Sequence, residues 1–146
     1  AVYHAISEED LVRIMQHPAT MIASDAAPGV PVFGRNVPHP RAYGTFARVL
    51  GLYVREKQVL TLEQAVRKMS GFPAQRLGLF DRGVIRPGMK ADLVVFDPAT
   101  VRDTATFEKP HQYAEGVSAV VVNGQLALAD GKITGARAGR VLKRNE

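Results

Sequence analysis

Hydrophobic positions in the first half of the chain recur with the spacing of helices. Ser7 is followed three positions later by an acid, and Thr61 is followed by Gln64, two patterns that resemble capping boxes at helix N-termini. Behind each cap, hydrophobic residues fall three and four positions apart, as they do on one face of an amphipathic helix. The pattern therefore predicts helices over residues 7–16, 45–56 and 61–70, and a short helical turn over 73–77.

The second half has the composition of strands. Residues 90–98 contain a continuous β-branched and aromatic run, and residues 117–122 contain another. The dipeptides Asn123-Gly124 and Asp130-Gly131 favour two-residue hairpin turns. These signals predict a mainly antiparallel sheet over residues 81–142, with a meander of strands at 117–122, 125–129 and 132–134.

A shorter hydrophobic run near the N-terminus ends on a carboxylate. The stretch MIASDAAPG predicts a buried strand over residues 20–24 that delivers Asp25 to its end. Four prolines between residues 26 and 41 then predict a long loop without regular structure. Asp25 could start a turn, the commoner role of such a residue, or could be an active-site acid at the C-terminal end of a barrel strand.

Composition excludes several classes of partner and location. The chain has 146 residues, ordinary hydrophobic content of 46% and a net charge of +5, so one soluble domain is the default expectation. The basic residues are scattered and do not alternate with aromatics, which argues against a nucleic-acid surface. Cysteine is absent, as in many proteins of the reducing cytoplasm, and no segment has the length of a membrane span.

The residues offer little self-contained chemistry. None of the four histidines forms a recognised metal-binding motif, and no nucleophile elbow or phosphate-binding loop is present, so no metal site is predicted within the chain. The loop sequence Pro38-His39-Pro40-Arg41 supplies a second candidate. Arg41 could bind a substrate carboxylate through two parallel hydrogen bonds, or it could be an exposed loop charge, and Arg35 has the same two interpretations.

Three segments together resemble a known family. They are SDAAPG…HPRAYGTFARVLGLYVRE, LEQAVRKMSGFPAQRLGLFDRGVIRPGMKADLVVFDPATV and VVVNGQLALADGKITGARAGRVL. They are similar to the C-terminal part of N-acyl-D-amino-acid deacylases, in the metal-dependent amidohydrolase superfamily. The resemblance implies an α/β plus β fold, in which residues 1–80 complete a (β/α)8 barrel and residues 81–146 supply strands of a small β-sandwich. It also implies that the chain is a segment of a longer parent protein.

The resemblance assigns roles to the candidate residues. It implies that Asp25 lies beside zinc and accepts a proton from the zinc-bound water, and that Arg41 and His39 bind the small-molecule substrate. The zinc ligands of the family lie upstream, so the segment alone is expected to bind no zinc and to be inactive. The sequence departs from the family pattern Gly-Ser-Asp-Gly, because Ala23 and Ala26 flank Ser24-Asp25, and the following loop is longer.

Two alternatives remain open at this point. The chain could belong to another amidohydrolase, such as a cyclic-amide hydrolase, or it could be a non-catalytic β-rich binding module. The HPRAYGTF segment favours the deacylases over the first alternative.

A barrel piece and a sandwich piece would each leave unpaired hydrophobic surface, so we also expect the separated segment to expose such surface and to self-associate.

Overall fold

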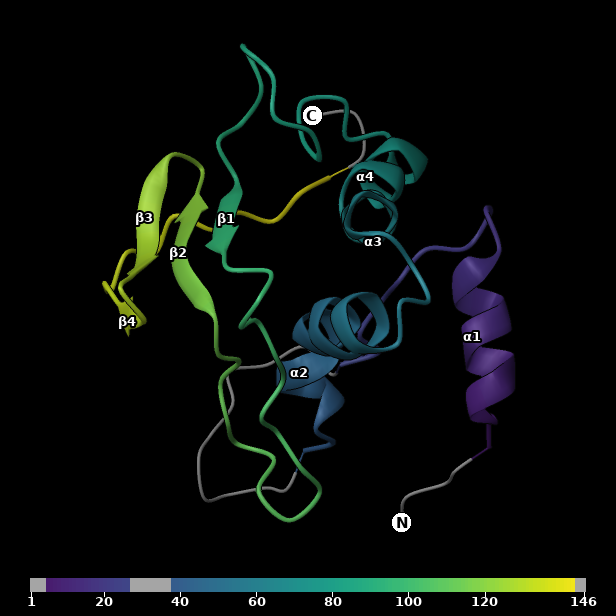
Figure 1. Cartoon of the computed structure of the whole chain (residues 1–146). Coiled ribbons are helices and arrows are strands. Elements are labelled where there is room, and N and C mark those ends of the chain that lie inside the picture. The colour runs from purple at the N-terminus through teal and green to yellow at the C-terminus, as the bar shows by residue number, and fades with distance from the viewer. Residues whose placement is uncertain (1–4, 27–37, 144–146) are drawn as a thin grey trace.

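The computed structural model describes residues 5–26 and 38–143 as a helical half followed by a β half (Figure 1). The helical half contains the α-helices α1 (Glu8–Gln16), α2 (Arg41–Arg48), α3 (Leu62–Met69) and α4 (Gly71–Leu77), and the π-helix η1 (Val49–Glu56), which continues α2. The β half contains β1 (Leu93–Phe96), β2 (Val117–Val122), β3 (Gln125–Ala129) and β4 (Lys132–Ile133).

Two helices begin where the sequence places their caps. The Ser7 hydroxyl accepts a hydrogen bond of 3.1 Å from the backbone N–H of Asp10 at the start of α1. Thr61 and Gln64 form the reciprocal capping box predicted for α3. Each cap satisfies backbone donors that a helix leaves without partners in its first turn. The predicted starts of both helices are therefore confirmed.

The other two predicted helices need correction. The segment expected at 45–56 begins at Arg41, four residues earlier. Pro40 has no N–H that would need an acceptor at the helix start, and its carbonyl accepts from the N–H groups of Tyr43 and Gly44. Its last eight residues form the wider π-helix, which apolar spacing alone does not distinguish from an α-helix. Helix α4 begins two residues before the predicted start at 73 and ends as predicted at the left-handed Gly78.

The helical half has its own hydrophobic core. Tyr53 of η1 is 4% exposed and Ala65 of α3 is fully buried, and both pack with Met15 of α1. Lys68 lies beside this core and is 5% exposed, with its ammonium group bonded to the backbone carbonyls of His17 (2.6 Å) and Thr20 (3.0 Å). These contacts attach the segment that leads to Asp25 to helix α3.

The strand predicted at residues 20–24 is wrong for the described structure. Residues 20–26 do not form a strand, and the N–H of Ile22 bonds instead to the carbonyl of Lys68 in helix α3 at 3.1 Å. A strand is defined by pairing with a neighbour. No strand lies beside this segment within the parts of the chain that the structure describes.

The predicted hairpins are confirmed. The four strands form one antiparallel sheet in the order β1-β2-β3-β4. At Asn123-Gly124 the φ angles are +46° and +78°, and at Asp130-Gly131 they are +48° and +73°. Positive φ at both central residues is the requirement of the hairpin turn that matches the twist of its strands. Local turn chemistry therefore brings β2 against β3 and β3 against β4.

The prediction of a mainly antiparallel sheet over residues 81–142 is too broad. The first strand covers Leu93–Phe96, not the whole of 90–98, and a long excursion without regular strands separates it from β2. An isolated antiparallel bridge between Arg102 and Glu115 closes the excursion. We call residues 102–115 the arm. In Figure 1 the arm is the green loop that extends beyond the sheet beside α2.

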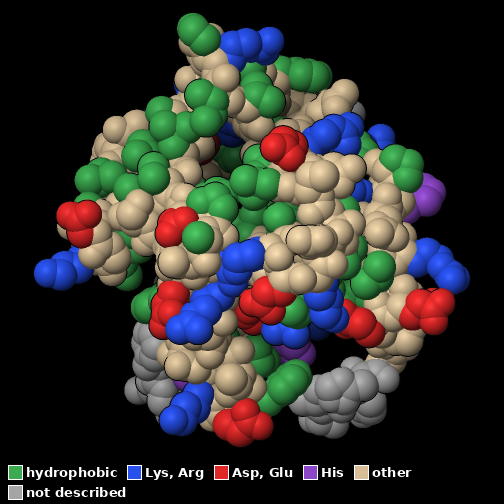
Figure 2. All heavy atoms as spheres, viewed as in Figure 1, with side chains coloured by type: hydrophobic (Ala, Val, Ile, Leu, Met, Phe, Trp, Pro, Cys, Tyr) green, Lys and Arg blue, Asp and Glu red, His purple; other side chains and the backbone are tan. Residues whose placement is uncertain are grey.

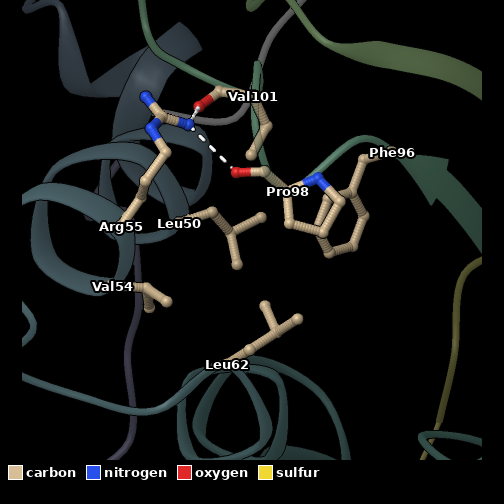
Figure 3. Close-up of a pocket in the computed structure, with 7 residues that line it drawn as sticks. All are labelled: Leu50, Val54, Arg55, Leu62, Phe96, Pro98 and Val101. Atoms are coloured by element: carbon tan, nitrogen blue, oxygen red, sulfur yellow. Dashed lines mark hydrogen bonds between the residues drawn. The ribbon is translucent and has the colours of Figure 1, made fainter.

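The two halves meet between η1 and the segment after β1. A Cβ atom on Gly51 would lie 2.8 Å from the Val101 carbonyl oxygen, so only glycine permits this approach. The Arg55 guanidinium bonds to the carbonyls of Val101 at 2.6 Å and Pro98 at 3.2 Å (Figure 3). Val101 is 1% exposed. The helical half and the base of the arm are therefore packed directly together.

The sheet exposes hydrophobic side chains. None of the described strand residues is fully buried, and Figure 2 shows hydrophobic side chains at the surface in the region of the strands. Val94 and Val95 of β1 are 57% and 55% exposed, and Ile133 of β4 is 68% exposed. The predicted exposed hydrophobic surface is thus present, while self-association stays a prediction. In the described ranges, no helix combines the length and hydrophobicity needed to cross a membrane.

Candidate functional site

Asp25 presents an accessible carboxylate. Its backbone has φ of +50°, a conformation that aspartate tolerates better than most residues. The N–H of Ala26 bonds to the Ser24 hydroxyl at 3.3 Å, which supports the turn locally. The Asp25 side chain is 84% exposed. Asp25 therefore lies in a turn and also presents an accessible carboxylate, so its role in the turn does not exclude a role as an active-site acid.

The structure brings Arg41 to Asp25. One terminal nitrogen of the Arg41 guanidinium lies 2.7 Å from a carboxylate oxygen of Asp25, although a long loop separates the two residues in sequence. The Arg41 side chain is 45% exposed. An ion pair this accessible to water contributes about 0–1 kcal/mol to stability. Arg41 can therefore exchange the Asp25 carboxylate for the carboxylate of a ligand at small cost.

His39 lies beside Arg41 but is engaged with the backbone and the arm. Its Nδ1 accepts a hydrogen bond of 3.1 Å from the N–H of Arg41. Its ring stands edge-on to Phe107 of the arm, with ring centroids 5.0 Å apart and an interplanar angle of 84°. These contacts suit a residue that shapes the start of α2, and they leave Arg41 as the charged candidate for binding a substrate.

Sequence reasoning missed a second link to the arm. The Tyr43 hydroxyl and Nδ1 of His111 are joined by a hydrogen bond of 2.9 Å across 68 positions of sequence. The ring of Tyr113 meets Tyr43 at a centroid distance of 5.9 Å. Loss of hydration, with a smaller contribution from Tyr113, raises the pKa of the Tyr43 phenol. No local pattern could reveal this group, because it exists only when the arm folds back onto α2.

The described residues do not form a metal site by themselves. In residues 5–26 and 38–143, no group of three histidine, cysteine, aspartate or glutamate side chains is placed to hold an ion. Asp25 offers one accessible carboxylate, a group of the kind that binds zinc or lies beside it. Any complete site that includes Asp25 therefore needs ligands from outside the described residues.

The cavity at the junction of the two halves is separate from this group. It has a volume of about 170 Å³ and is lined mainly by hydrophobic side chains (Figure 3). Arg55 is the one charged residue of its lining, and its guanidinium is bonded to backbone carbonyls. Asp25, His39 and Arg41 do not line it. This cavity offers no convergent polar groups for chemistry, unlike the Asp25–Arg41 pair.

Comparison with known families defines the class of the chain. The model of the amidohydrolase family matches residues 9–127, which include Asp25, Arg41 and the whole arm. The chain therefore belongs to the amidohydrolase family.

Individual relatives narrow this class. The chain is 51% identical over 144 residues to a D-aminoacylase of Alcaligenes xylosoxydans xylosoxydans, covering 99% of this chain and 29% of the relative. A crystal structure of D-aminoacylase matches with a TM-score of 0.87 at 50% identity, over 95% of this chain and 28% of that one. A further match, with a TM-score of 0.79 at 46% identity, covers 90% of this chain and 27% of an N-acyl-D-glutamate deacylase from Bordetella bronchiseptica, complexed with zinc and a phosphonate mimic of the tetrahedral intermediate. The chain thus spans less than a third of the length of these relatives.

Proposed function

We propose that the chain is the C-terminal segment of a zinc-dependent enzyme that hydrolyses N-acyl-D-amino acids to D-amino acids and a carboxylate. The observation that carries the proposal is the Asp25–Arg41 pair, in a chain half identical to a D-aminoacylase over nearly its whole length. Such a reaction needs a base beside the scissile amide and a cation for the carboxylate of the substrate. The pair supplies both kinds of group side by side.

Asp25 is the general base in this proposal. Its carboxylate accepts a proton from the attacking water as the water oxygen bonds to the acyl carbon. It then donates that proton to the nitrogen as the C–N bond breaks, so the amine leaves neutral. Zinc, when bound through ligands outside the described residues, would lower the pKa of the attacking water. The exposed position of Asp25 allows its carboxylate to reach such a centre.

Arg41 is the anchor for the carboxylate of the substrate. A guanidinium matches a carboxylate geometrically through two parallel hydrogen bonds, which a lysine ammonium cannot form. Because Arg41 already holds the Asp25 carboxylate at 2.7 Å, its side chain can reach a carboxylate in this region. His39, whose Nδ1 accepts the backbone N–H of Arg41 at 3.1 Å, is the second residue proposed to bind the substrate.

The division of the chain follows the same proposal. Residues 1–80 belong to the end of a (β/α)8 barrel, and residues 81–146 belong to a small β-sandwich. Support comes from the change at this boundary, where α4 is the last helix in the described part of the chain and all four described strands follow. The absence of cysteine from the sequence fits a cytoplasmic enzyme.

The test uses the full-length protein that carries this segment. We expect stoichiometric zinc by elemental analysis and turnover of N-acetyl-D-amino acids well above that of the L enantiomers. A cyclic amide offered in parallel separates a deacylase from a cyclic-amide hydrolase. Exclusive turnover of the cyclic amide, or no turnover of either compound by zinc-loaded protein, would contradict the proposal.

A further inference from the structure

We propose that the arm, residues 102–115, positions Arg41 for the carboxylate of the substrate, with His111 and Phe107 as positioning residues. The inference rests on the proposed function, because that function assigns the carboxylate to Arg41. It makes part of the β half a determinant of substrate affinity, although Arg41 lies at the start of α2 in the helical half.

The first link joins the arm to α2 just after Arg41. Tyr43 is two residues beyond Arg41, and its hydroxyl is hydrogen-bonded to His111 Nδ1 at 2.9 Å. The two rings also meet edge to face, with centroids 5.7 Å apart and an interplanar angle of 81°. The hydrogen bond and the ring contact together fix the distance and orientation of the Tyr43 side chain relative to the arm. The first turn of α2 cannot move away from the arm without losing both.

The second link joins the arm to the residues just before Arg41. Phe107 packs edge-on against His39 at 5.0 Å, and His39 Nδ1 accepts the backbone N–H of Arg41 at 3.1 Å. This N–H lies at the helix start, where donors have no partner within the helix. Arg41 is therefore held between two contacts with the arm, one through His39 and one through Tyr43.

The arm is internally braced, so that it can transmit a fixed position. The Gln112 side-chain amide donates to the carbonyls of Thr104 at 2.6 Å and Lys109 at 2.9 Å. The Thr104 hydroxyl donates to the carbonyl of Tyr113 at 2.8 Å, and the bridge between Arg102 and Glu115 closes the base of the arm. Because these hydrogen bonds join the two sides of the arm at several points along its length, the arm holds its shape.

If the arm served only to keep α2 folded, weakening its links near Arg41 would unfold α2. Asp103 near the base of the arm bonds to Arg48 at 3.1 Å, and a Cβ atom on Gly44 would lie 2.8 Å from the Asp103 Cβ, so this contact secures the middle of α2 by itself. Weakening the links near Arg41 should therefore leave α2 folded. Weakening these links should loosen the first turn of α2, misalign the Arg41 guanidinium and weaken substrate binding, while the Asp25 base stays in place.

The experiment compares variants of the full-length enzyme. We expect Tyr43→Phe and His111→Ala each to raise KM for an N-acetyl-D-amino acid about 10-fold, the scale of one hydrogen bond to a charged or ordering group, with kcat changed less than about 2-fold. His111→Asn, whose amide can occupy the position of Nδ1, should restore most of the affinity. Lys109→Ala is the matched control, because this exposed residue is on the arm and contributes its carbonyl, not its side chain, to the bonds described above.

A double-mutant cycle separates positioning from general destabilisation. In an Arg41→Ala background, Tyr43→Phe should have little further effect on KM, because the group that it positions is gone. Full additivity, or a fall in kcat with KM unchanged, would overturn the inference.

Amide hydrogen exchange tests the same inference without activity. Tyr43→Phe and His111→Ala should increase exchange at residues 41–44 and leave α3 unchanged. Unchanged exchange at 41–44 would overturn the positioning role. If the variants exchange as expected but the wild-type protein hydrolyses no N-acyl-D-amino acid, the proposed function alone is contradicted.

Discussion

Replacing Asp25 by asparagine in the full-length enzyme removes the proposed base and keeps the shape of the side chain. Asparagine has the same heavy-atom outline and still accepts hydrogen bonds, but it cannot take a proton from water. Replacing Arg41 by alanine removes the proposed anchor and leaves the base in place. The two variants therefore separate proton transfer from substrate binding within one pair of contacting side chains.

The structure limits the effect of both changes on stability. Asp25 is 84% exposed and Arg41 is 45% exposed, so their ion pair at 2.7 Å is screened by water. Such pairs contribute about 0–1 kcal/mol, which corresponds to a change in the melting midpoint of no more than about 4 °C in a protein of this size or larger. Any large kinetic change must therefore arise in the active site and not from unfolding.

The kinetic effects are expected to differ in kind. Loss of a general base costs about 10²–10⁴ in kcat, or about 2.7–5.4 kcal/mol of transition-state free energy, so Asp25→Asn should reduce kcat by that range. Its effect on KM should be small, because the proton moves mainly in the transition state. Arg41→Ala removes hydrogen bonds to a charged group, worth about 1.5–3 kcal/mol, and should raise KM about 10- to 150-fold.

The assay is steady-state hydrolysis of an N-acetyl-D-amino acid, with zinc content and melting midpoint measured on each variant. Arg13→Ala is a suitable control, because Arg13 also forms an exposed ion pair, with Glu9 at 3.2 Å on α1. Asp25→Asn with wild-type kcat would show that Asp25 serves only the turn. An Arg41→Ala variant that loses kcat at unchanged KM would show that Arg41 acts in the chemical step and not as an anchor.

Three further predictions follow from other parts of the molecule. The 146-residue chain alone should bind no stoichiometric zinc by elemental analysis and should self-associate in light scattering, with dye binding to its exposed hydrophobic surface; a compact, dye-free monomer would contradict the second expectation. Lys68→Ala should lower the free energy of unfolding in urea by about 1–3 kcal/mol, because it removes the hydrogen bonds that the ammonium group donates to the carbonyls of His17 and Thr20; an unchanged urea midpoint would refute that role. The hydrogen bond from Lys57 lowers the pKa of Glu8 in the folded chain. The contribution of this pair to stability should therefore be present above the ordinary glutamate pKa and be lost as the pH falls through the lowered folded value. Glu8→Gln should reduce the loss of stability at acidic pH, and an unchanged acidic part of the stability curve would count against the pairing.

Part of the fold is encoded in local sequence. The capping box of Thr61 and Gln64 and the turn at Asn123-Gly124 form within a few residues, so their effect on the backbone does not depend on what packs around them. Asp25 and Arg41 could also be singled out, since their residue types follow a hydrophobic run and a proline-rich loop. Local hydrogen bonding and backbone preference explain why these predictions were possible.

The remaining features depend on contacts between distant segments. The strand expected at 20–24 is absent because the described chain offers it no neighbouring strand, and strand structure requires a partner. The π-helical turns of η1 could not be inferred from apolar spacing. The hydrogen bond between Tyr43 and His111 joins residues 68 positions apart and arises only when the arm folds onto α2.

The sequence by itself thus determined the starts of α1 and α3, the positions of both hairpin turns, and which two charged residues to examine. Only the tertiary structure decided that Asp25 and Arg41 touch, and that the arm contacts His39 and Tyr43 on either side of Arg41. The physical reason is the range of the interactions. Caps and turns are satisfied by neighbours in sequence, whereas the geometry of a binding site depends on side chains that only the folded chain brings within hydrogen-bonding distance.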